Sequence, residues 1–476
     1  MKRTSLFASW APLLLGAFVG AAGAADSVTQ TVGGLSITVT DLGLLPNGGT
    51  SAQAYAINNS GRIVGMATDA GFALRRVYWD AASGTIIGEL PNLDPASTAV
   101  PEAINDNHEV AGTERIRSGL YYGVYWDTSG TVHALRPIPG GLTTLVMAHG
   151  ISNNGWIAGR SQEGAPNYYG HAVIWRLPDG DPLDLGFLGT GNYSEAYDVN
   201  DLGQVVGVAN NGGASLGFLW REGQGYTNLG SLTSPTTGAS IAHAVNNTGT
   251  IVGTSNGGYL PVMWTYDPND PNSPAQIHEL PRPTDMISAA AVAVNDLGDI
   301  AGYGAPSMGI GNRAVLWRNG AAINLGTWPG GTTSLARDIN NDGQIVGEGN
   351  LAPDGYVHAL MWMVAPTGGG GGGGDGGGGA ANTSPSVTLT ALTPTSIKLG
   401  RSVTVAGAFS DPDQGPWSYA FAWGDGASAT GTASTDGSLD PQTHVYTQRG
   451  TYKVGLTVTD AGGLAGISHT VTVHVK

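Results

Sequence analysis

The sequence predicts an all-β protein in which a seven-bladed β-propeller, residues 36–365, precedes an immunoglobulin-like β-sandwich, residues 385–476. Two observations lead to this fold class. One four-strand pattern recurs seven times, and strand-like alternation resumes only after a glycine tract. The composition agrees, since 12% of the residues are charged and 77 are glycine, a profile typical of short strands joined by tight turns.

Residues 1–25 have the form of a secretory signal peptide. Lys2 and Arg3 precede the apolar stretch Trp10–Val19, and a run of small residues follows. We therefore expect an exported protein, extracellular or periplasmic, that is not inserted in a membrane once this segment is removed. The absence of cysteine means that packing must supply the stability. The net charge of −16 argues against a nucleic-acid partner.

The repeated pattern has a period of 45 to 49 residues. In its first copy a strand ends at Ile57, Asn58–Gly61 supplies residues suited to a tight turn, and Ile63 resumes a strand, so a β-hairpin is expected. The hairpin position of Asn58 is filled along the chain by Asn58, Asn105, Ser152, Asn200, Asn246, Asn295 and Asn340. The next position is always Asn or Asp: Asn59, Asp106, Asn153, Asp201, Asn247, Asp296 and Asn341.

Two columns of the repeat never vary. One holds the glycines Gly65, Gly112, Gly159, Gly207, Gly253, Gly302 and Gly347. The other holds the tryptophans Trp79, Trp126, Trp175, Trp220, Trp264, Trp317 and Trp362. A tryptophan required in every copy is explained better by packing between blades than by sugar stacking. The non-periodic Trp156 and Trp328 are the better ligand candidates.

The two ends of the repeat region are expected to meet. The last repeat stops at Trp362 without a fourth strand, and residues 37–43 form a strand with the Leu-Gly ending of a fourth strand. Pairing of these two segments would close the ring and leave no sheet edge exposed. Residues 366–384 are a polyglycine linker, which is a flexible tether.

The repeats resemble the HAF-type repeats of extracellular bacterial proteins. The resemblance covers the Ile-Asn hairpin, the Val-Gly strand, and a His-Ala segment before tryptophan that survives as His171–Trp175 and His358–Trp362. It implies no established chemistry. The C-terminal region resembles the PKD domain through Tyr419–Gly426, His444–Tyr446 and Gly450–Asp460. This second resemblance implies that Asp425 has a structural role in a turn.

The most informative column lies three residues before the hairpin asparagine, because it varies within a rigid pattern. It holds Tyr55, Glu102, His149, Tyr197, His243, Val292 and Arg337. If the first strand is the innermost, these side chains lie near a central channel. We predict that the ligand-binding residues are Tyr55, Glu102, His149, Tyr197, His243 and Arg337. The alternative is that these are variable polar residues at the mouth of an inert channel. If the protein is an enzyme, the catalytic candidates are His149, His243, Tyr197 and Arg337.

Three classes of function remain open. The first is a secreted binding or adhesion-type protein whose two domains contact a polysaccharide or a cell-surface protein. The second is a polysaccharide lyase or hydrolase, in which an Arg neutralises a uronate and a Tyr or His removes its proton. The third is a structural component of an envelope or matrix. No metal site or cofactor is predicted. Calcium, held by the Asn/Asp columns or by Asp267–Asn272, is the alternative.

Overall fold

The computed structural model describes residues 26–364 and 385–476, apart from 33–34, 47, 117–119, 179, 235–237, 258–259, 269, 271–272, 308–310, 352–354, 392–394, 412–415, 426, 436, 461–464 and 468–470. The predicted signal peptide (1–25) and polyglycine linker (366–384) lie outside these residues. Every regular element in the described residues is a β-strand, which confirms the all-β class. The chain divides into two compact units, one within residues 1–365 and one within 366–476.

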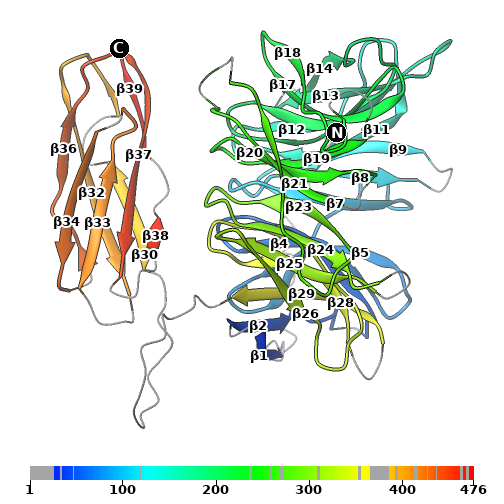
Figure 1. The fold of residues 1–476 in the computed structure, drawn as a ribbon, viewed down its shortest axis with the longest axis horizontal. Coiled ribbons are helices and arrows are strands. Elements are labelled where there is room, and N and C mark those ends of the chain that lie inside the picture. The colour runs from blue at the N-terminus through cyan, green and yellow to red at the C-terminus, as the bar shows by residue number, and fades with distance from the viewer. Residues whose placement is uncertain are drawn as a thin grey trace, which may run out of the picture. The chain divides into compact units, whose positions relative to one another are not determined.

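In the first unit, the first six repeats each contribute four consecutive antiparallel strands (Figure 1). The first three comprise β3 (Ala52–Ile57), β4 (Arg62–Thr68), β5 (Leu74–Asp80), β6 (Thr85–Glu89); β7 (Thr98–Ile104), β8 (Val110–Arg115), β9 (Tyr121–Trp126), β10 (Val132–Ala134); and β11 (Gly141–Ile151), β12 (Trp156–Glu163), β13 (Gly170–Arg176), β14 (Asp181–Gly186). The next three comprise β15 (Ser194–Val199), β16 (Val205–Asn211), β17 (Ala214–Arg221), β18 (Gly225–Asn228); β19 (Ser240–Val245), β20 (Thr250–Ser255), β21 (Leu260–Thr265), β22 (Gln276–Glu279); and β23 (Ser288–Val294), β24 (Ile300–Ala305), β25 (Arg313–Arg318), β26 (Ala321–Gly326).

The seventh repeat is completed by the N-terminal segment. Its own strands are β27 (Ser334–Ile339), β28 (Ile345–Asn350) and β29 (Val357–Val364), and β2 (Leu35–Asp41) pairs antiparallel with β29, placing Val39 opposite Trp362. The predicted pairing of the two ends is therefore confirmed. A further strand, β1 (Ser27–Val32), pairs with β2 and begins before the predicted domain boundary at residue 36.

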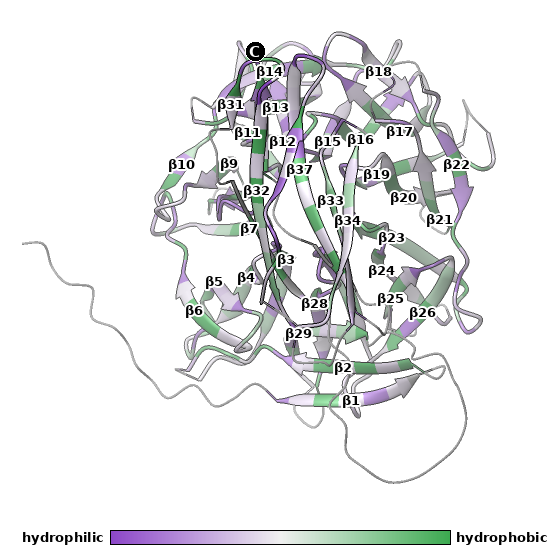
Figure 2. Ribbon diagram, turned by 90° about the vertical axis from the view of Figure 1, so that its left-hand side faces the viewer, coloured by the Kyte–Doolittle hydropathy of each residue, from purple (hydrophilic) through white to green (hydrophobic). Residues whose placement is uncertain are grey.

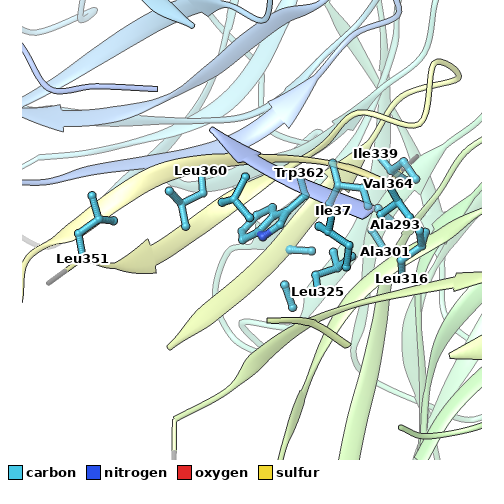
Figure 3. Packing of buried hydrophobic residues seen from close by; sticks show 14 residues of the cluster. Ile37, Ala293, Ala301, Leu316, Leu325, Ile339, Leu351, Leu360, Trp362 and Val364 are labelled. Atoms are coloured by element: carbon cyan, nitrogen blue, oxygen red, sulfur yellow. The ribbon is translucent and has the colours of Figure 1, made fainter. Parts of the chain in front are cut away.

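The tryptophan column is buried between neighbouring repeats. All seven tryptophans are at most 7% exposed. Trp362 packs against Leu316 and Leu325 of the sixth repeat and Ile37 of β2 (Figure 3). Trp79 of the first repeat packs with side chains of the seventh, including Met361. The interpretation of these residues as packing between repeats is confirmed.

The Asn/Asp column links the hairpins of neighbouring repeats. The backbone N–H of each member donates to the side-chain Oδ1 of its counterpart in the next repeat at 2.7 to 2.9 Å. The seventh member, Asn341, donates to Asn59 of the first, so the circuit returns to its start. The Oδ2 atoms of Asp106, Asp201 and Asp296 accept from the asparagine amides on both sides. Asn and Asp alternate along the chain because an amide donates and a carboxylate accepts.

The second unit contains two sheets. Their strands are β30 (Ser386–Ala391), β31 (Ser396–Ile397), β32 (Ser402–Ser410), β33 (Trp417–Ala422), β34 (Ser428–Ala433), β35 (Gly437–Ser438), β36 (Gln442–Val445), β37 (Gly450–Thr459), β38 (Ala465–Ile467) and β39 (Val471–Val475). Trp423 and Tyr446 lie in the core between them, and the Tyr446 hydroxyl donates to the Trp423 carbonyl at 2.9 Å. Asp425 accepts a hydrogen bond from the Ala427 N–H and contacts His444, which is the structural role expected of it.

Candidate functional site

The variable column occupies one β-bulge in every repeat. Ala54 pairs with Gly65 and Ala56 with Val64, so Tyr55 is an extra residue without a partner on β4. The same interruption occurs in all seven first strands. The extra residues are Tyr55, Glu102, His149, Tyr197, His243, Val292 and Arg337. A bulge bends the strand and redirects the extra side chain, so the backbone presents seven side chains of five kinds in one geometry.

The invariant glycines make these bulges possible. A Cβ placed on any of them would lie 1.9 to 2.1 Å from a carbonyl oxygen of the first strand. For Gly207 that oxygen belongs to Glu195, two residues before the bulged Tyr197. Because no side chain fits at such a distance, the glycine column is fixed by the close approach of two backbones.

All seven bulged residues line one cavity of about 280 Å³. The residues beside them and the hairpin Asn/Asp pairs complete the lining. Figure 2 shows the repeat sheets arranged around a common centre, with β3, β19 and β23 nearer to it than β6, β22 and β26. The first strand is therefore innermost, as expected. Every predicted site residue, Tyr55, Glu102, His149, Tyr197, His243 and Arg337, faces this single cavity.

His149 is the centre of a charged cluster in the cavity wall. Its Nδ1 lies 2.6 Å from Glu102 Oε2 and its Nε2 lies 3.0 Å from Glu195 Oε1. Burial lowers the pKa of His149, but the two carboxylates outweigh this effect and raise the pKa to about 10. The ring is consequently a cation at neutral pH.

Glu195 was missed by the sequence-based reasoning. It lies on β15 and is 7% exposed. It accepts a hydrogen bond from the Tyr193 hydroxyl and lies 3.8 Å from Arg160. Burial raises the pKa of Glu195, but the hydrogen bond from His149 and the neighbouring cations bring it below its usual range. The signal in the sequence was a lone acidic residue in a column that is otherwise uncharged.

Arg337 and Tyr55 form a second cluster at the junction of the seventh and first repeats. The Arg337 guanidinium contacts both carboxylate oxygens of Glu348, at 2.9 and 3.3 Å, and lies 4.9 Å from the centre of the Tyr55 ring. Burial raises the pKa of the Tyr55 hydroxyl, which donates to Gln53. Glu348 was also missed. It follows an invariant glycine in a second variable column, which in another repeat holds Arg160.

The opposite side of the charged cluster is aromatic. The Tyr197 ring lies between His149 and His243, with centroid distances of 5.6 and 5.9 Å. Burial lowers the pKa of His243 to about 4. The cavity therefore holds one cationic and one neutral imidazole at neutral pH. Val292 occupies the bulge between His243 and Arg337.

Two buried carboxyl groups, on Asp198 and Asp338, also line the cavity and were not predicted. They stand two residues before the hairpin position, where the other repeats have Ala or Gly. Each binds its own following N–H and the N–H of a residue in the next repeat. Burial raises the pKa of Asp198 to about 6 and that of Asp338 to about 7. Departure from a small residue was the available signal.

We expect these two carboxyl groups to titrate far above the ordinary value of 3.8. Because the folded state holds these protons more tightly than the unfolded state, their contribution makes the protein less stable as the pH rises from about 4 to about 7. A ¹³C NMR titration of aspartate side chains tests this. The substitution Asp198→Asn should lower the midpoint of Asp338, since the two charges repel. Midpoints near 3.8 for both groups would contradict the assignment.

The non-periodic tryptophans do not line the cavity. Trp156 lies under the Arg176 guanidinium, 4.6 Å from its ring, and presses against Gly203. Trp328 packs on the core between the sixth and seventh repeats. Both side chains are partly buried and pack against a core, and their role as ligand contacts stays a prediction.

Within the residues that the structure describes, no group of three or more His, Cys, Asp or Glu side chains is arranged to hold a metal ion. Across that same part of the chain, no helix is long and apolar enough to span a membrane.

Comparisons with known proteins identify the second unit. Residues 382–475 match the family model of the PKD domain. Two solved structures are similar. One is the PKD domain of an M14-like peptidase from Thermoplasmatales archaeon SCGC AB-540-F20, with 23% identity over 20% of this chain and 98% of that one and a TM-score of 0.18. The other is the PKD domain of the human VPS10 domain-containing receptor SorCS2, with 18% identity over 22% of this chain and 94% of that one and a TM-score of 0.17. A search of curated proteins found no match. The C-terminal unit, residues 382–475, is a PKD domain.

Proposed function

We propose that residues 36–365 form a closed seven-bladed β-propeller of the HAF-repeat type, that the protein is exported by bacteria, and that the propeller cavity binds a carbohydrate. Ring closure is supported by the pairing of β2 with β29 and by the hydrogen-bond circuit that returns from Asn341 to Asn59. Export is supported by the form of residues 1–25 and by the PKD domain.

One observation carries the binding proposal: the column in which the repeat varies lines one cavity. The scaffold around it is held constant by glycines and tryptophans, while the seven half-buried bulged residues are of five kinds. Aromatic rings with a few polar groups are typical of small-molecule sites, and a volume of about 280 Å³ lies just below their usual range of about 300–1,000 Å³. The cavity therefore suits a single sugar residue better than a polymer segment.

Binding accounts for the charges better than β-elimination does. A lyase needs a free cation for the uronate and a neutral base for its proton. Here Arg337 is engaged by Glu348, and His149 is held as a cation by two carboxylates. Only His243 has the character of a neutral base, and no cation pairs with it in the cavity wall.

The PKD domain is proposed to add a second contact with a cell surface or polymer. The intervening residues 366–384 are glycine-rich, which is typical of a flexible linker. Once one of two linked sites has bound, the other is held at a high effective concentration, so two weak sites together bind more tightly than either alone. Loss of either site should then weaken retention on an insoluble polymer far more than loss of a single independent contact would.

Pull-down on a panel of insoluble polysaccharides and cell envelopes tests the function. We expect the full-length protein to be retained on at least one of these surfaces. The substitution Tyr197→Ala, which removes the ring between the two histidines, should weaken retention about tenfold. Tyr168→Ala is the matched control, because Tyr168 is 53% exposed on a loop and does not line the cavity. Failure of every surface to retain the wild type would contradict binding, and self-association without ligand would favour a structural role.

A further inference from the structure

The cavity is surrounded by backbone N–H groups. In every repeat the hairpin residue donates its N–H to the second strand, at 2.9 to 3.1 Å. Antiparallel strands alternate between paired and outward-facing N–H groups, so the N–H of the preceding residue points away from the second strand. Since the first strand is innermost, these groups point towards the cavity. They belong to Ile57, Ile104, Ile151, Val199, Val245, Val294 and Ile339.

The protein fills four of these donor positions with its own carboxyl groups. Asp198 accepts from Val199 and from Val245 of the next repeat, at 2.8 and 2.9 Å. Asp338 accepts from Ile339 and from Ile57 of the first repeat, both at 2.8 Å. In each case one carboxyl group bridges two neighbouring repeats, with one oxygen on each N–H. The chain thus shows which chemical group this geometry accommodates.

The second and third repeats present the same pair of donors without the carboxyl group. Ile104 and Ile151 line the cavity, and no side chain in the described part of the chain accepts from their N–H groups. Ala103 stands where the other two pairs have Asp198 and Asp338. Val294 has the remaining N–H group. Its two neighbours around the cavity, the N–H groups of Val245 and Ile339, already donate to Asp198 and Asp338.

We infer that the Ile104 and Ile151 N–H groups bind the carboxyl group of a small acid, the size of one sugar acid, that enters the cavity. The inference uses the cavity of the proposed function and names its ligand class. The adjoining charges are balanced, because Glu102 and Glu195 face His149 and Arg160. An entering carboxylate therefore meets two donors and a balanced set of four charges. The nearby Asp106 carboxylate has no cation beside it, but it is engaged by the Asn59 and Asn153 amides.

The substitution Ala103→Asp tests the inference, because it supplies the missing carboxyl group from the chain. The fold already contains this arrangement elsewhere. Asp338 of the seventh repeat is preceded by Ala293 at the equivalent position of the sixth, and an aspartate at position 103 would likewise be preceded by Ala56 of the first repeat. We expect the wild type to bind glucuronate but not glucose, and Ala103→Asp to bind glucuronate at least tenfold more weakly with an unchanged or higher unfolding temperature. The matched control Ile287→Asp adds the same charge at an exposed position outside the cavity and leaves the Ile104 and Ile151 pair vacant, so its affinity should stay within a few-fold of the wild type.

A second measurement does not depend on a variant. In a ¹⁵N NMR titration of the wild type with glucuronate, the amide signals of Ile104 and Ile151 should shift more than those of Val199 and Ile339, which are already engaged. Competition with a polyuronate distinguishes a polymer end, which displaces glucuronate, from a free acid, which the polymer does not displace. Unshifted Ile104 and Ile151 signals, or equal binding by Ala103→Asp, would overturn the inference. Polymer capture in the pull-down would still leave the proposed function standing.

Discussion

Replacing Gly207 with alanine is expected to lower the free energy of unfolding by about 3 kcal/mol or more. The added Cβ would lie 2.0 Å from the Glu195 carbonyl oxygen, and that oxygen belongs to a backbone which cannot move without undoing the bulge at Tyr197. The change therefore breaks the pairing of β15 and β16 and displaces Glu195 from His149. Urea unfolding followed by tryptophan fluorescence measures the loss.

Gly88→Ala is the matched control for this prediction. Gly88 also lies in a strand, but its added Cβ would only touch the Tyr78 ring at 3.7 Å, an ordinary contact. We expect its free energy of unfolding to stay within about 0.5 kcal/mol of the wild type. If Gly207→Ala unfolds at the same urea concentration as Gly88→Ala, the bulge is not the reason why glycine is invariant at this position of the repeat.

His149→Gln is expected to cost about 3 kcal/mol near pH 6, because it removes the imidazolium that lies between the half-buried Glu102 and the buried Glu195 carboxylates. The pKa of His149 is raised from 6.5 to about 10 in the folded state. Its contribution is therefore complete below about pH 6.5, falls as the pH rises, and is lost above about pH 10.

The difference in unfolding free energy between wild type and His149→Gln should consequently narrow between pH 6.5 and pH 10. Urea unfolding of both proteins at several pH values in this interval measures it. His243→Gln is the comparison, since burial lowers the pKa of His243 to about 4 and its ring is neutral throughout this range. A pH-independent difference for His149→Gln would show that His149 is not charged in the folded protein.

Much of the fold could be predicted from the sequence because the same residue pattern recurs in every repeat. One copy of Asn58–Gly65 is a weak hairpin signal, but seven aligned copies place every hairpin and every buried tryptophan. The orphan strand at 37–43 likewise predicted its partner, because a missing fourth strand and an extra one complement each other. Strand β1 was overlooked because it lies outside the repeat.

The sequence predicted which residues line the cavity but not which side chains they contact there. Variation at Tyr55 and its counterparts correctly identified residues that line the cavity. The invariant glycines indicated the β-bulges that redirect these side chains, because a glycine within a strand often marks a bulge. The partners Glu195 and Glu348 could not be found this way, because strand register decides which side chains meet across the sheet. Asp198 and Asp338 lie in a column that holds Ala or Gly in the other five repeats, so the common pattern of the repeats does not reveal them.

Within one repeat, the residues that maintain the fold differ from the residue that lines the cavity. Glycine, tryptophan and the hairpin Asn/Asp pairs maintain identical bulges and identical spacing between repeats. The bulged residue carries no pairing of its own on the second strand, so it can differ from repeat to repeat without altering the sheet. The side chains that line the cavity can therefore differ between repeats while the backbone of the repeats stays the same.

The most direct test of the account is an alanine scan of the bulged residues, read as the affinity of each variant for the polysaccharide that retains the wild type. We expect several of the variants Tyr55→Ala, Glu102→Ala, His149→Ala, Tyr197→Ala, His243→Ala and Arg337→Ala to lose affinity at least tenfold while remaining folded. Alanine at the exposed Ile87, Leu183 and Ile287 should have no effect. Unchanged affinity across the six bulge variants, with binding abolished by removal of residues 385–476, would contradict it and place recognition in the PKD domain.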